Sequence, residues 1–243
     1  GVANDKSIAW GCAKAFRAAG AELAITFQNA KAEPHVRPLA EALGASLILP
    51  LDVQEDAQMQ TVFAAIKQQW GRLDFLLHAI AFAPKDDLHG RVTDSSRGGF
   101  LEAMDISCHS FVRMAHYAEP LMTEGGALLT TSYYGSQKVV EHYGIMGPVK
   151  AALESCVKYL AAELGQKDIR VNALSPGPLL TRAASGIEHF NELLEEARLK
   201  SPQRDNVTID AVGALARFLV SDDARFITGN TEYIDAGYHI IGG

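Results

Sequence analysis

Residues 75–82 have the sequence FLLHAIAF and residues 127–133 have the sequence ALLTTSY, so both runs are apolar at successive positions. A strand that is apolar on both faces is typical of a sheet that helices cover on both sides. Four further runs of this kind predict short strands over 22–27, 46–51, 170–174 and 231–235. Together the six runs predict a buried parallel sheet.

Apolar residues at helical spacing separate these runs. One stripe begins at Ile8, and others begin at Met59, Val149 and Ile209, with Thr208 as the expected N-cap of the last helix. Strands that alternate with helices at this spacing predict βαβ units. We therefore expect an α/β fold, a doubly wound parallel sheet of Rossmann type with helices on both faces.

The chain has 243 residues, which suffices for one large α/β domain or two small ones. No repeat, linker or change of composition divides it, so we expect residues 1–243 to form a single Rossmann-type domain. A sheet of this type places its first, central strand immediately before the turn that begins here at Gly1. We therefore expect that strand to be missing from this sequence.

Composition narrows the classes of partner. The chain has 22 basic and 29 acidic residues, a formal charge of −7, which disfavours nucleic acid and anionic membranes. The most apolar run is far shorter than the ~20 residues of a membrane span. Cys12, Cys108 and Cys156 are too few and too scattered for a disulfide framework or a zinc site, and the eight histidines show no ligand spacing. We expect free thiols, no metal and a cytoplasmic location.

The N-terminal residues indicate a dinucleotide site. Gly1 lies at the expected exit of the preceding strand, and Ser7 and Ile8 lie at the expected start of a helix, whose free N–H groups would face a pyrophosphate. The spacing is not the full G-x-G-x-x-G fingerprint. Small residues that only pack a helix start would produce the same pattern.

Residues at the ends of the predicted strands agree with such a site. Gln28 occupies the place where NAD enzymes carry an acid, and its amide can bind a ribose hydroxyl. No arginine adjoins it to favour a 2′-phosphate, so we expect NADH, with NADPH disfavoured. Asp52, followed by Val53, could accept from the adenine amine or cap a turn. The next strand ends in Ala79, Ile80 and Ala81. Residues this small would let a cofactor pass close to the strand, and a tightly packed strand would require them as well.

The segment YGIMGPVK, from Tyr143 to Lys150, is the strongest catalytic candidate. Seven residues are two helical turns, so we expect both side chains on one face of a helix. A nearby ammonium stabilises a phenolate and can hold ribose hydroxyls, and a tyrosine hydroxyl can donate to a developing oxyanion. Pro148 lies between them, so the helix either starts near Tyr143 or is kinked.

With these motifs the sequence resembles the short-chain dehydrogenase/reductase superfamily, and within it the bacterial NADH-dependent enoyl-[acyl-carrier-protein] reductases. Those enzymes place the lysine seven residues after the tyrosine, as here, whereas other members place it four residues after, at Gly147 here. They also carry a second tyrosine ten residues earlier, here Tyr133. Further matching segments are 1–9, 27–29, 52–53, 78–84, 104–107, 170–173 and 177–186.

The resemblance implies hydride transfer from NADH to the β-carbon of a trans-2-enoyl thioester of fatty-acid synthesis, in a homotetramer. It implies that Tyr143 stabilises the enolate, that Lys150 holds the nicotinamide ribose and that Tyr133 lines the acyl site. It also implies that Thr181 contacts the pyrophosphate or amide end of the cofactor and Ile80 its adenine side. Acyl carrier protein or CoA would carry the substrate.

Residues 179–201 match a mobile substrate-binding flap of these enzymes. Its helical part, 187–200, has four glutamates against Arg198 and Lys200, although relatives present bases there to an acidic carrier. We therefore expect carrier docking to be weakened, relocated or replaced by a smaller thioester such as a CoA ester.

Two other departures matter. Ala81 stands where the relatives have glycine, which predicts weaker binding of phenol-type inhibitors. The segment 175–177, Ser-Pro-Gly, resembles the wider superfamily. A carbonyl or alcohol oxidoreductase is therefore the alternative function, and a catalytically silent NAD-binding paralogue is the other.

Overall fold

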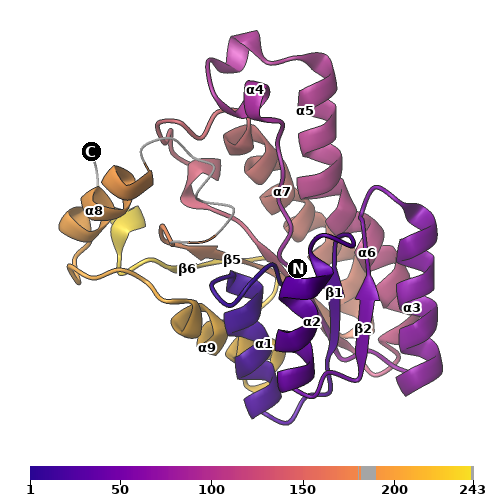
Figure 1. The fold of residues 1–243 in the computed structure, drawn as a ribbon. Helices are drawn as coiled ribbons and strands as arrows, with labels where there is room; N and C mark the ends of the chain where they lie inside the picture. Colours follow the sequence, from indigo (N-terminus) through magenta and orange to yellow (C-terminus); the bar gives the residue numbers. More distant parts are fainter. Residues whose placement is uncertain (180, 182–189, 242–243) are drawn as a thin grey trace.

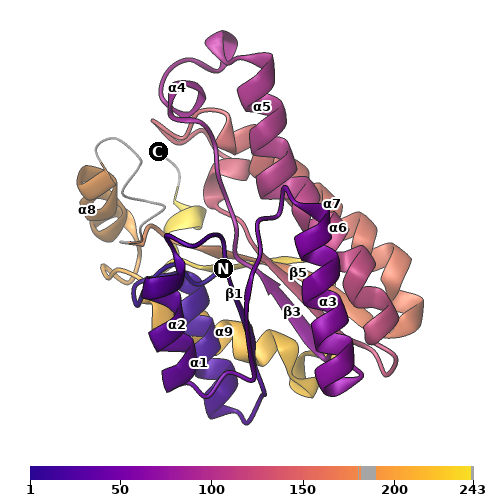
Figure 2. The ribbon, with the colours of Figure 1, turned by 45° about the vertical axis from the view of Figure 1, so that its right-hand side comes forward.

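The computed structural model describes residues 1–179, 181 and 190–241. Parallel strands run through the middle of the molecule with helices on either side, as Figures 1 and 2 show. The strands are β1 (Ala24–Phe27), β2 (Leu47–Pro50), β3 (Phe75–His78), β4 (Gly126–Thr131), β5 (Ile169–Pro176) and β6 (Thr231–Ile234). All six predicted strands are thereby confirmed, with ends that differ from the predicted ones by a few residues.

The helices between the strands are α1 (Ile8–Ala18), α2 (Glu33–Ala42), α3 (Asp56–Trp70), α4 (Lys85–Leu88), α5 (Arg97–Met104), α6 (Ser110–Ala118), α7 (Met146–Leu164), α8 (Phe190–Lys200) and α9 (Ile209–Val220). The four predicted stripes lie in α1, α3, α7 and α9, and further helices accompany them. A π-helical turn, Asp105–His109, joins α5 to α6. The hydroxyl of Thr208 accepts from the backbone N–H of Ala211, which confirms the predicted cap of α9.

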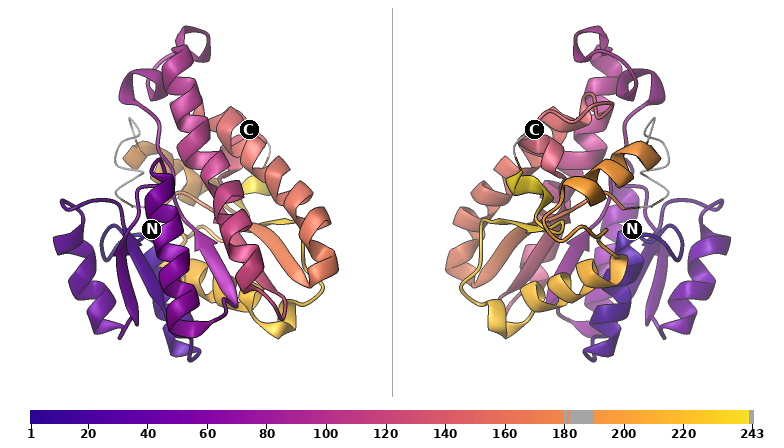
Figure 3. Two further views of the ribbon diagram at one scale, coloured as in Figure 1. Left: turned by 90° about the vertical axis from the view of Figure 1, so that its right-hand side faces the viewer. Right: turned by 90° about the vertical axis from the view of Figure 1, so that its left-hand side faces the viewer.

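Each face of the strands has its own core. Helices α3, α6 and α7 pack on one face, and α1, α2 and α9 pack on the other (Figure 3). Neighbouring residues of β4 point to opposite faces, so Leu128 belongs to the first core and Leu129 to the second, both fully buried. Truncation of either to alanine would cost about 2–5 kcal/mol. Helices on both faces confirm the predicted doubly wound α/β fold.

The strands form two hydrogen-bonded sheets. β1 pairs with β2, and the other sheet has the order β3-β4-β5-β6, with every pair parallel. A cavity of about 640 Å³ is lined by residues of both β1 and β3, among them Ile25 and Leu77. No ladder of hydrogen bonds joins β1 to β3 among the described residues.

The position of α1 follows from its close crossing with α9. A Cβ added to Gly11 would lie 2.1 Å from the carbonyl oxygen of Ile209, and one added to Gly213 would lie 2.4 Å from that of Gly11. Only glycine permits this close approach of the two helices. The crossing orients the N-terminus of α1 towards the carboxyl ends of the strands. No helix among residues 1–179, 181 and 190–241 combines the length and apolar character of a membrane span.

Candidate active site

A cavity of about 200 Å³ opens at the carboxyl ends of β3, β4 and β5. Ligands of open α/β sheets bind at this edge. The cavity brings together five residues that the sequence predicts for the site: Ile8, Ala81, Tyr133, Tyr143 and Thr181. The remaining lining is mostly apolar and comes from Phe82, Ala83, Leu88, Ser132, Met146, Pro176, Gly177, Pro178 and Leu179.

Tyr133 and Tyr143 contact each other in this cavity. Their ring centroids lie 4.9 Å apart with the planes at 66°, an edge-to-face arrangement. Burial raises the pKa of both hydroxyls, so both keep their protons at neutral pH. The Tyr133 hydroxyl is buried and has no hydrogen-bond partner among the residues that the structure describes. Such a group is costly without a partner, which fits a polar ligand atom in the cavity.

The predicted helical relationship between Tyr143 and Lys150 is wrong. Helix α7 begins at Met146, so Tyr143 lies in the turn before it. The backbone N–H of Tyr143 donates to the carbonyl oxygen of Val140 at 3.3 Å, and that of Met146 donates to the oxygen of Tyr143 at 3.1 Å. Pro148 is the third residue of α7, where a missing N–H costs no helical hydrogen bond, so the helix needs no kink there.

Gly144 places this turn against the rim of the cavity. Its φ is 50°, and a Cβ there would lie 2.5 Å from the carbonyl oxygen of Leu88. A side chain at Gly144 would therefore push Tyr143 away from the segment that carries Leu88.

Lys150 lies in the first two turns of α7 and is 4% exposed. Its Nζ donates to the carbonyl oxygen of Thr131, at the end of β4, across 2.7 Å. Burial lowers the pKa of Lys150 to about 8. An ammonium has three donors, and this contact uses one of them, so two remain to bind a ligand.

Glu154 is a site residue that the sequence reasoning missed. It lies one turn after Lys150 and is buried, and its Oε1 accepts from the hydroxyls of Ser132 at 2.5 Å and Ser136 at 2.6 Å. These bonds fix α7 to the loop that carries Tyr133. The spacing of four residues from Lys150 was the only available signal, and many exposed helix residues share it.

Several predicted cofactor residues lie at the same edge but outside the cavity. The backbone amine of Gly1 donates to the carbonyl oxygen of Ala79 at 2.8 Å, and the Ser7 hydroxyl donates to that of Asn4 at 2.8 Å. Ser7 is the N-cap residue of α1. Gln28 is exposed directly after β1.

The remaining predicted residues have structural contacts. Asp52 follows β2, and its Oδ1 accepts from the backbone N–H of Gln54 at 3.1 Å, the turn-capping alternative considered for it. Val53 is buried in the core of the α3 face, and Ile80 packs against that core. Among the described residues no three of His, Cys, Asp and Glu are grouped to hold a metal ion.

These features define a Rossmann-type α/β protein with a tyrosine-lined cavity at the carboxyl edge of its strands. The chain belongs to the enoyl-(acyl carrier protein) reductase family, whose sequence model matches residues 1–239. The resemblance stated from the motifs is thereby confirmed.

Individual relatives match over the whole chain. It is 48% identical to enoyl-[acyl-carrier-protein] reductase [NADH] 1 of Rhizobium meliloti, over 100% of this chain and 89% of that protein. It is 51% identical to the reductase of Anaplasma phagocytophilum solved in complex with NAD, with a TM-score of 0.96 over 100% of this chain and 93% of that one. The Bacillus cereus reductase, solved with NADP+ and indole naphthyridinone, has a TM-score of 0.97 at 47% identity, over 100% of this chain and 95% of that one.

Proposed function

We propose that this chain is an enoyl-[acyl-carrier-protein] reductase that reduces trans-2-enoyl thioesters with NADH. The observation that carries the proposal is the pair of protonated tyrosines, Tyr133 and Tyr143, in one apolar cavity, with the unpartnered hydroxyl of Tyr133. Bound NADH would supply the hydride for the β-carbon. Family membership and the names of the relatives support this substrate class.

Tyr143 performs the electrostatic part of the reaction. Its hydroxyl donates to the thioester oxygen, on which negative charge develops as the β-carbon accepts a hydride. Because burial raises the pKa of this hydroxyl, the proton stays on Tyr143 until that charge has formed. The apolar lining excludes water, which strengthens the hydrogen bond. Tyr133 lines the acyl side of the cavity.

The residues that would hold the cofactor lie along the carboxyl edge. The two unused N–H donors of Lys150 would bind the nicotinamide ribose, and the N-terminus of α1, with Ser7 and Ile8, would face the pyrophosphate. Gln28 would bind the adenine ribose. Further contacts would come from Gly1, Asp52, Val53, Ala79, Ile80, Ala81 and Thr181.

NADH oxidation at 340 nm with crotonyl-CoA and with the crotonyl carrier protein tests the function. We expect turnover with NADH, slower turnover with NADPH, and a large loss in Tyr143→Phe. The same assay with carbonyl substrates distinguishes an enoyl reductase from the alternative, a carbonyl or alcohol oxidoreductase. Turnover of a ketone but of neither enoyl thioester would overturn the proposal, and NADH binding without any turnover would indicate the silent paralogue.

Of the flap proposed for 179–201, Leu179 and Thr181 line the cavity, and residues 180 and 182–189 lie outside the described residues. Helix α8 is the helical part of this segment. Burial chiefly raises the pKa of the Tyr133 hydroxyl, and the charge of Glu196 on α8 adds a smaller effect in the same direction. Both basic residues of α8 are held by glutamates of the same helix, Arg198 by Glu195 at 2.7 Å and Lys200 by Glu196 at 2.8 Å. We propose that this pairing weakens docking of an acidic carrier and leaves CoA esters comparably good substrates.

We also propose a homotetramer. Phe218 is 41% exposed and Phe226 is 84% exposed, and a partner surface would cover such rings. Light scattering should give four times the mass of the 26.2 kDa chain, and a monomer mass would contradict the proposal.

A cytoplasmic location is proposed as well, supported by the three free thiols. Fractionation of the source cells checks it.

A further inference from the structure

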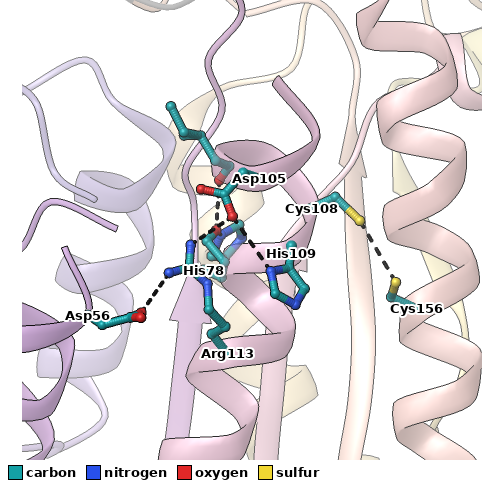
Figure 4. A network of polar contacts seen from close by, with 9 residues as sticks. Asp56, His78, Asp105, Cys108, His109, Arg113 and Cys156 are labelled. Carbon is teal, nitrogen blue, oxygen red and sulfur yellow. Dashed lines mark hydrogen bonds and ion pairs between the residues drawn. The ribbon is translucent and has the colours of Figure 1, made fainter. Parts of the chain in front are cut away.

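Two cysteines that lie 48 positions apart in the chain face each other beside the active site. Cys108 lies in the π-helical turn Asp105–His109 and Cys156 lies in the middle of α7. Figure 4 shows the two thiols pointing at each other from these elements, and their sulfur atoms are 3.8 Å apart. A disulfide needs about 2 Å between the sulfurs, so the pair has to close by less than about 2 Å.

The two thiols differ in access and acidity. Cys156 is partly exposed, whereas Cys108 is 3% exposed. A hydrogen bond joins the two sulfurs, and it lowers the pKa of Cys156 to about 7 and raises that of Cys108. Cys156 is therefore the nucleophile that an oxidant meets first, and Cys108 is the thiol placed to resolve its oxidised form.

A hydroperoxide is the class of oxidant that this pair would react with. The Cys156 thiolate attacks the terminal oxygen, the O–O bond breaks, and the alkoxide released takes up a proton to give an alcohol. Cys156 becomes a sulfenic acid. The Cys108 sulfur then attacks the Cys156 sulfur, and the S–O bond breaks as the hydroxyl leaves with the Cys108 proton as water. Two electrons pass from the two sulfurs to the hydroperoxide.

The π-helical turn connects this pair to the cavity. Ser107, the neighbour of Cys108, donates its hydroxyl to the carbonyl oxygen of Phe82 and accepts from the N–H of Phe82, both at 2.9 Å. Phe82 lines the cavity with Tyr133 and Tyr143. A single π-helical turn yields more easily than the 19-residue α7, so closure of the disulfide displaces Ser107 and with it Phe82.

From this geometry we propose that Cys108 and Cys156 form a reversible disulfide that lowers turnover at the neighbouring active site. Displacements of about 1 Å near a reaction centre can cost roughly 100-fold in rate, so we expect at least ~10-fold lower kcat in the oxidised chain. The third cysteine, Cys12, is fully buried in α1 on the opposite face and takes no part.

The test is to treat the full chain with cumene hydroperoxide and to map its peptides by mass spectrometry without reduction. We expect a 108–156 linkage with the loss of two hydrogens, a fall in kcat, and recovery of both with dithiothreitol. Cys12→Ser should behave like the unsubstituted chain, whereas Cys156→Ser should form no linkage and keep its kcat.

Cys108→Ser separates closure of the disulfide from oxidation of Cys156 alone. This variant still forms the sulfenic acid but cannot resolve it, so its kcat should stay within about twofold. An equal loss of kcat in Cys108→Ser would overturn the proposal, as would a 108–156 linkage without a change in kcat, or oxidation without that linkage. Peptide mapping is independent of turnover, so an inactive reduced chain would contradict the proposed function and not the linkage.

Discussion

The rings of Tyr133 and Tyr143 meet edge to face, with their centroids 4.9 Å apart. The Tyr133 hydroxyl has no hydrogen-bond partner among the described residues. The contact holds two hydroxyls in one apolar cavity. It therefore positions two donors without using either of them for the fold.

Replacing Tyr143 by phenylalanine removes the donor to the developing oxyanion. We expect kcat with crotonyl-CoA to fall about 10²–10³-fold, the usual effect of losing one such donor, while NADH affinity stays within about twofold. Steady-state kinetics and a fluorescence titration with NADH measure the two quantities. A kcat within about threefold of the unsubstituted chain would exclude the proposed role of Tyr143.

Replacing Tyr133 by phenylalanine removes a buried hydroxyl without a partner. The unliganded variant should be more stable by about 1 kcal/mol, because the desolvation cost of that hydroxyl disappears. Urea unfolding measures this free energy. Tyr159→Phe is the matched control, since Tyr159 is 71% exposed and its hydroxyl reaches water. A loss of stability in Tyr133→Phe would show that the hydroxyl has a partner in solution.

Burial of Lys150 makes a prediction about stability and pH. The folded-state pKa of Lys150, about 8, lies below its value of 10.5 in the unfolded chain. Between these pH values the unfolded chain binds more protons, so folding becomes more favourable as the pH rises. Relative to that of Lys150→Met, the free energy of unfolding of the unsubstituted chain should rise by on the order of 3 kcal/mol between pH 7 and pH 10.

Unfolding in urea at the two pH values checks this gain. Lys158→Met on the exposed side of α7 controls for the loss of a lysine as such. If Lys150→Met and Lys158→Met respond alike to pH, Lys150 keeps an ordinary pKa in the folded chain.

Ala81 adds a methyl group to the wall of the 200 Å³ cavity. Ala81→Gly should enlarge the cavity and strengthen the binding of a phenol-type inhibitor, by about tenfold if the methyl now prevents close contact. Inhibition constants at fixed NADH measure this. An unchanged inhibition constant would show that Ala81 does not limit the pocket.

The ion pairs of α8 predict how carrier protein binds. Glu195→Gln with Glu196→Gln frees Arg198 and Lys200. At low salt kcat/KM with the crotonyl carrier protein should rise several-fold, roughly the effect of changing rim charges on association, and added salt should remove the gain. The value of kcat/KM with crotonyl-CoA should be the same in this variant as in the unsubstituted chain.

The exposed Glu163→Gln on α7 controls for overall charge. If the unsubstituted chain already turns over carrier substrate quickly, and added salt slows it, a basic surface elsewhere docks the carrier and the pairing in α8 is irrelevant.

The strands and the helices α1, α3, α7 and α9 were predictable because their signals are local. Burial on both faces makes successive residues apolar, as in Leu128 and Leu129, and the side-chain periods of strands and helices are visible in any short window. The cap at Thr208 is equally local.

Tyr143 shows where local reasoning failed. Its distance of seven residues from Lys150 suggested two turns of one helix, but α7 begins at Met146 because the preceding turn closes its own backbone hydrogen bonds. The spacing still selected the pair of residues for which we propose the catalytic roles. It did so through resemblance to a family and not through helical geometry.

The sequence by itself therefore determined the fold class and the family, and it predicted the Tyr–Lys pair, because periodicity and motif spacing are properties of neighbouring residues. Only the tertiary structure decided that Glu154 binds Ser132 and that Cys108 faces Cys156. Both contacts join residues that are tens of positions apart. Such contacts arise where packed elements cross, and the positions of those crossings follow from the burial of the whole chain and from no single segment.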